Sequence, residues 1–124
     1  MYKPGKEKAT RIEFRSPDPA CNPYLAFSVM LAAGLKGIEK GYPLPDPIEE
    51  DLYHFSPEKR KEMNIQELPG NLYESILEVE KSELVREALG DHIFYKFIEN
   101  KKIEWDRYRT HVSQYELDTY LPKL

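Results

Sequence analysis

Arg11, Glu13 and Arg15 are the residues of this chain whose types and spacing best suit chemistry. They alternate with Ile12 and Phe14 in the stretch RIEFR. Successive side chains of a strand point to opposite faces. The alternation therefore predicts a short strand over residues 11–15, with its charged side chains on one face and its apolar side chains on the other.

That charged face fits a site for an anionic, metal-bound substrate. A glutamate carboxylate ligates Mg²⁺ or Mn²⁺ through oxygen, and arginine guanidinium groups bind carboxylates and phosphates with paired hydrogen bonds. ATP-driven activation of a carboxylate must bring metal, carboxylate and phosphate together. The alternative is a solvated strand face with cross-strand ion pairs, and the alternation by itself leaves both readings open.

The other candidate residues indicate no chemistry. His54, His92 and His111 are far apart and lack the spacing of metal ligands. The chain has no glycine-rich phosphate loop and no nucleophile elbow. Its one cysteine, Cys21, is expected to be a small packed residue, because no catalytic context surrounds it.

The N-terminal third must position the charged face. Residues 1–10 are predicted to form a loop, and three prolines after the strand exclude regular structure up to residue 22. Asn22 and Pro23 are a typical helix start, and Gly41 is a typical stop. The intervening helix, residues 22–40, is apolar or small on most sides, so we expect it to be buried.

The rest of the chain is predicted to be a proline-rich loop followed by helices. The loop covers residues 42–57, and its length is typical of a docking or functional segment. The helical region covers residues 71–121, with capping boxes at Asn71 and Ser113 and a helix end at Gly90. The fold class is therefore mostly α, with one short N-terminal strand that has no evident partner strand.

Composition narrows the functional classes. The chain has 124 residues, 40% of them hydrophobic, and a net charge of −4, which fits one globular unit and disfavours nucleic acid as a partner. No stretch approaches the length of a membrane span, and the N-terminus lacks an apolar signal region. With a single cysteine no internal disulfide can form, so we expect a cytoplasmic protein.

The longer stretch RIEFRSPDPACNPYLAF closely resembles a segment late in the catalytic domain of type I glutamine synthetase. The family pattern there is R-[IV]-E-x-R-x-P-D-P-[AS]-x-N-P-Y-L. The similarity continues through LAAGLKGIEKG, DLYHFSPE and LPGNLYESI, so it covers essentially the whole chain. The resemblance implies the C-terminal portion of an α+β catalytic domain, without the N-terminal β-grasp domain and the earlier part of the catalytic domain.

The resemblance also implies a function and residue roles. The family is a ligase that makes glutamine from glutamate and ammonia, using ATP and Mg²⁺ or Mn²⁺, through γ-glutamyl phosphate. Glu13 would be a metal ligand, and Arg15 would bind glutamate and act at the transferred phosphoryl group. Lys8 and Arg11 would lie at the nucleotide side. The remaining ligands would lie outside this chain, so we expect the chain by itself to be inactive.

Three expectations remain open. Tyr53 aligns with a tyrosine that is adenylylated in many bacterial members, but its neighbours differ, so an ordinary packed or loop tyrosine is the alternative. The segment from Ser113 to Leu124 would reach into the opposite ring of a dodecamer, or else fold back on its own domain. Finally, the chain could be a stand-alone helical interaction module that docks on a synthetase or another partner.

Overall fold

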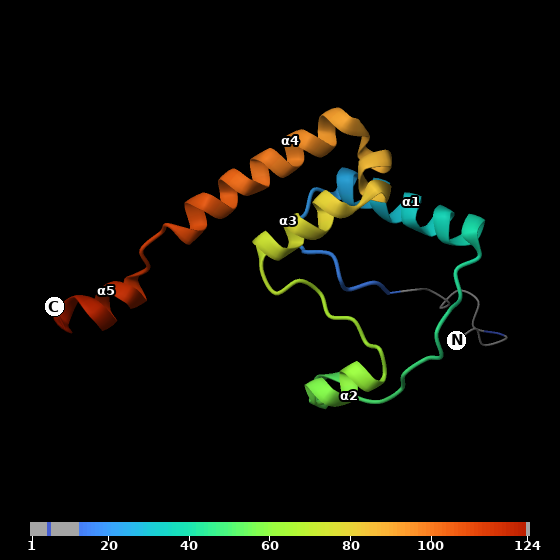
Figure 1. The fold of residues 1–124 in the computed structure, drawn as a ribbon, viewed down its shortest axis with the longest axis horizontal. Helices are drawn as coiled ribbons and strands as arrows, with labels where there is room; N and C mark the ends of the chain where they lie inside the picture. Colours follow the sequence, from blue (N-terminus) through green and yellow to red (C-terminus); the bar gives the residue numbers. More distant parts are fainter. Residues whose placement is uncertain (1–4, 6–12, 124) are drawn as a thin grey trace.

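The computed structural model describes residue 5 and residues 13–123, and this part of the chain is mostly helical (Figure 1). Its elements are α1 (Pro23–Lys40), the 3₁₀ turn η2 (Leu52–His54), α2 (Pro57–Glu62), α3 (Leu72–Lys81), α4 (Glu83–Arg109), α5 (Gln114–Tyr120) and the 3₁₀ turn η3 (Leu121–Lys123). The predicted mostly helical class is confirmed for these residues.

The predicted strand over residues 11–15 is not seen. Residues 13–15 have no regular secondary structure, and Arg11 and Ile12 lie outside the described residues. A strand is held by hydrogen bonds to a neighbouring strand, and the described residues form none. The prediction was therefore wrong for this chain, because local alternation was present without a sheet to pair with.

Helix α1 begins and ends where the sequence predicts. The Asn22 side chain accepts hydrogen bonds from the backbone N–H groups of Tyr24 and Leu25. Gly41 closes the helix in the left-handed region, with φ 61°. The predicted burial is not seen, because α1 has no buried residue. Among the described elements α4 is the one helix that packs against α1, which leaves most of the α1 surface uncovered.

Helix α4 bends sharply at Gly90, which the sequence predicts as a helix end. Gly90 has φ 73° and ψ 153°, a combination that is essentially restricted to glycine. A second helical segment begins at once after it, so the predicted helix end at Gly90 is confirmed as the point where the two helical segments of α4 meet. Before the kink, α4 meets α1 through the Lys36–Glu87 ion pair; after it, Lys102 pairs with Glu80 of α3.

The core lies between α3 and the part of α4 after the kink. Its buried members are Ile76, Phe94 and Ile98. Half-buried side chains from both helices pack around them, namely Leu72, Val79, Val85, Leu89 and Trp105. Because residues on both sides of the kink contribute, the bend lets one helix hold α1 and α3 together.

Two peripheral pieces contact no other helix among the described elements. Helix α2 lies in the long connection between α1 and α3, where Phe55 is buried and the Lys59 ammonium lies 3.8 Å from its ring centre. Helix α5 contacts the adjacent η3 only, and it projects from the far end of α4 (Figure 1). No described helix is both long and apolar enough to cross a membrane.

Candidate functional site

Glu13 and Arg15 are the predicted site residues that the structure brings together. Arg15 Nε donates a hydrogen bond of 2.5 Å to Glu13 Oε1, and Arg15 Nη2 forms an ion pair with the same oxygen at 2.5 Å. Both side chains are exposed, Arg15 by 85% and Glu13 by 54%. The two side chains thus lie on one side of the backbone, as the alternation predicts, and an exposed ion pair of this kind is weak. Each group is therefore free to exchange its partner for a ligand of opposite charge.

The other two predicted site residues, Lys8 and Arg11, lie outside the described residues. Their predicted place at the nucleotide side therefore stays a prediction.

The described residues do not form a complete metal site. They contain no cluster of three or more His, Cys, Asp or Glu side chains able to hold an ion. Mg²⁺ requires about six oxygen ligands in octahedral geometry. Glu13 fits the role of one such ligand, since its carboxylate is exposed and bound by a single arginine.

A stiff corner connects this pair to α1. The Asp18 side chain accepts a hydrogen bond of 2.7 Å from the Ala20 N–H, and the Asp18 carbonyl accepts one of 3.0 Å from the Cys21 N–H. The next residue is Asn22, the N-cap of α1. Cys21 itself is exposed, so the expectation of a packed thiol was wrong. The hydrogen bonds of this corner hold the segment that leads from residues 13–15 into the start of α1.

Tyr53 lies on the surface of the long connection. Tyr53 is 85% exposed, and its ring lies edge to face with the His54 ring, with 5.4 Å between the two ring centres. Asp51 holds the turn by accepting hydrogen bonds from the Tyr53 N–H at 3.0 Å and from His54 Nδ1 at 2.8 Å. Tyr53 is thus a loop residue without a packed ring, and its adenylylation stays a prediction.

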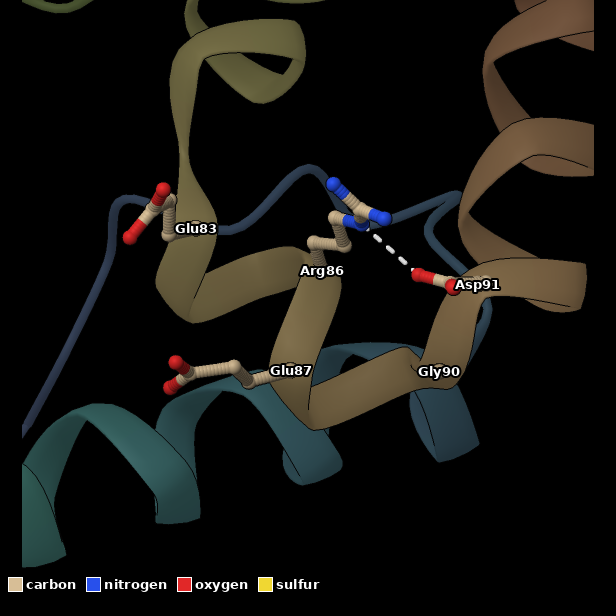
Figure 2. Close-up of a pocket in the computed structure, with 5 residues that line it drawn as sticks. All are labelled: Glu83, Arg86, Glu87, Gly90 and Asp91. Atoms are coloured by element: carbon tan, nitrogen blue, oxygen red, sulfur yellow. Dashed lines mark hydrogen bonds and ion pairs between the residues drawn. The ribbon is translucent and has the colours of Figure 1, made fainter.

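A charged depression at the α4 kink is the feature that sequence reasoning missed (Figure 2). It has a volume of about 440 Å³ and is lined by Glu83, Arg86, Glu87, Gly90 and Asp91. Arg86 Nε donates to Asp91 Oδ1 at 2.7 Å, across the bend. Residues five apart do not face each other on a straight helix, so this pair exists because Gly90 turns the chain.

The charges of this depression are engaged within the fold. The hydrogen bond between Arg86 and Asp91 raises the pKa of Arg86 and lowers the pKa of Asp91. Glu87 accepts a hydrogen bond of 3.1 Å from Lys36, which raises the lysine pKa. We interpret the depression as a clamp that holds the kink and joins α1 to α4, because its ion pairs link these elements.

Comparison with known proteins identifies the chain's relatives. Residues 2–120 match the family described as "Glutamine synthetase, catalytic domain". A glutamine synthetase of Mycobacterium tuberculosis is 53% identical over 121 residues, which is 98% of this chain and 27% of that protein. A glutamine synthetase of Methanococcus voltae is 51% identical over 114 residues, and one of Thermotoga maritima is 50% identical over 114 residues. In both cases the match covers 92% of this chain and 26% of the relative.

Proposed function

This chain belongs to the glutamine synthetase catalytic-domain family, and we propose that it supplies one part of the active site of an enzyme that joins glutamate and ammonia. The chain spans 27% of the length of the first relatives it matches. The activity, substrates and partners of a complete synthetase are therefore proposed for an assembly that contains this chain, and for the chain by itself we propose none.

The observation that carries the proposal is the Glu13–Arg15 pair. It lies in the stretch that matches the family, and it presents a carboxylate and a guanidinium side by side on an exposed surface. In the assembled site, Arg15 binds the carboxylate of glutamate and then faces the phosphoryl group during its transfer. Glu13 supplies an oxygen ligand for Mg²⁺ or Mn²⁺, and the ion, when bound, neutralises phosphate charge. Lys8 and Arg11 bind ATP.

The proposed reaction has two steps. The γ-carboxylate oxygen of glutamate attacks the γ-phosphorus of ATP, so that ADP leaves and γ-glutamyl phosphate forms. Ammonia then attacks the carbonyl carbon of the γ-glutamyl phosphate; the C–O bond to phosphate breaks, phosphate leaves, and the nitrogen loses a proton to give the amide of glutamine. Arg15 acts by offsetting negative charge at the transferred group, because a planar guanidinium holds phosphate oxygens with two hydrogen bonds.

Assembly and location are further parts of the proposal. The matching family and the projecting helix α5, which contacts no other helix among the described elements, support a homo-oligomer, and we propose a dodecamer in which this arm reaches a second ring. The exposed thiol of Cys21 suits the reducing cytoplasm.

A hybrid enzyme tests the function. The matching region of the Thermotoga maritima relative, which is 50% identical over 114 residues, is replaced by this chain. The hybrid should make glutamine. Glu13→Gln and Arg15→Lys should each lower kcat by about 10²–10³-fold, as expected for a lost charge-stabilising contact. Glu49→Gln, an exposed loop position, is the matched control. Turnover near the control level in the Glu13 and Arg15 variants would refute the assigned roles.

A second candidate function, a helical module that docks on a synthetase polypeptide, is favoured by one specific observation. Helix α1 has no buried residue although it is rich in apolar side chains.

A further inference from the structure

Helix α1 carries a stripe of large apolar side chains that the chain leaves uncovered. Its members are Tyr24, Phe27, Leu31, Leu35 and Ile38, which are 82%, 66%, 64%, 58% and 82% exposed. A single exposed apolar residue is ordinary, but a contiguous set marks an interaction surface. We call these five residues the α1 stripe.

The spacing of the α1 stripe places it on one face of the helix. The intervals of three, four, four and three residues keep the side chains within an arc of about 80° at 3.6 residues per turn. At 1.5 Å per residue the stripe is about 21 Å long. None of its members carries a charge, so its partner must be apolar over a similar length.

The stripe faces away from the packing that α1 makes within the chain. Lys36, which pairs with Glu87 of α4, lies about 100° or more around the helix from every member of the stripe. The half-buried residues of α1 are centred on the other side of the helix; they are Leu25, Ala26, Val29, Met30, Ala32, Lys36 and Gly37. The helix therefore has one face toward α4 and a second face that requires an external partner.

The length of the family's polypeptide indicates what that partner is. The first relatives have 27% of their length matched by this chain, so nearly three quarters of a synthetase subunit lies outside it. The stripe begins at Tyr24, directly after the corner that holds Glu13 and Arg15. A surface that covers the stripe would thus lie beside the pair, where the missing metal ligands are needed.

We propose that the α1 stripe is a docking surface for the remaining part of a synthetase catalytic domain, and that this chain can bind that part as a separate polypeptide. The inference rests on the proposed function, since it takes its partner from the same family. Binding buries the stripe against an apolar surface and brings the partner's oxygen ligands to Glu13. The driving force is the removal of apolar area from water.

Co-expression tests the proposal with the full 124-residue chain. The probe is the Thermotoga maritima glutamine synthetase without the region that matches this chain. The tagged chain should recover this polypeptide in soluble form, with the two in equal amounts. The double variant Phe27→Asp/Leu31→Asp should lower recovery by at least about tenfold, because it places unpaired charges in an apolar contact. Ala33→Asp, exposed on the far side of the helix from Leu31, should recover it normally.

The outcomes separate docking from catalysis. Failure to recover the truncated polypeptide, or equal recovery by the double variant, would overturn the proposal. So would self-association of the chain through Leu31, detected by light scattering as a dimer that Leu31→Asp converts to a monomer. A stable complex that makes no glutamine would leave docking in place and count against the proposed function. An active hybrid, together with failure of the separate chain to bind the truncated synthetase, would support the proposed function and overturn docking.

Discussion

Replacing Phe94 and Phe27 with alanine, one at a time, should separate the residues that stabilise this chain from those reserved for a partner. Phe94 is 4% exposed and packs with Ile76 and Ile98, whereas Phe27 is 66% exposed on the α1 stripe. A Phe→Ala change in a packed core costs about 3–5 kcal/mol, since lost burial adds to the cavity left behind. Phe27 buries only about a third of its surface, which scales the burial term of about 1.5–3 kcal/mol to about 0.5–1 kcal/mol.

The assay is urea unfolding followed by the fluorescence of Trp105, the chain's one tryptophan. This side chain packs against the core and stacks on Tyr73 at 5.9 Å, so it reports on the α3–α4 contact. The Phe94→Ala chain should lose most of its cooperative transition, while the Phe27→Ala transition should shift little. Equal losses would show that α1 is already packed in the free chain, which would refute the reasoning.

Three further predictions follow from particular contacts. Gly90→Ala should lower the free energy of unfolding by about 1–3 kcal/mol in the same urea assay, because φ 73° strains any side chain. Gly34→Ala, in regular helix with open space, should instead raise it by up to about 1 kcal/mol. If both substitutions changed the free energy of unfolding in the same direction, a strained kink at Gly90 would be excluded. The hydrogen bond from the Ser113 N–H lowers the pKa of Glu116 below its ordinary value of 4.5; a depressed pKa contributes stability that is present above about pH 4.5 and lost as the pH falls through the folded-state value. The NMR chemical shift of the Ser113 amide should change with pH as Glu116 titrates, and Glu116→Gln should abolish this pH dependence. An unchanged pH dependence in that variant would assign the titration to another group. The isolated chain should show no saturable Mn²⁺ binding by calorimetry and make no glutamine, since Glu13 is one ligand of several; measurable turnover would contradict this.

Features set by local contacts could be predicted from the sequence. The caps at Asn22, Asn71, Ser82 and Ser113 all form, because each requires only a side chain and backbone N–H groups two or three residues away. The Ser113 capping box is complete, whereas Glu74 turns its second oxygen to the N–H of Gly70.

Features that depend on distant partners could not be predicted from local patterns. Residues 13–15 form no strand because the described part of the chain offers no second strand to pair with, and α1 stays unburied because α4 is the one described helix that packs against it. Gly90 ends the first helical segment of α4 as the sequence predicts, but the placement of the second segment depends on Val85 and Leu89 before the kink packing against the cluster that contains Phe94 and Ile98. The side-by-side position of Glu13 and Arg15 was predictable, since residues two apart in extended backbone share a side.

The binding of Mn²⁺ to the hybrid synthetase tests most directly whether this chain supplies a metal ligand. Free and bound Mn²⁺ are distinguished by electron paramagnetic resonance, in the hybrid and in its Glu13→Gln and Glu49→Gln variants. Loss of the Glu13 carboxylate should weaken one Mn²⁺ site by about tenfold or more, and the Glu49 change should leave every site unaltered. Unchanged Mn²⁺ affinity in the Glu13→Gln hybrid would contradict the proposed role of this chain in the active site.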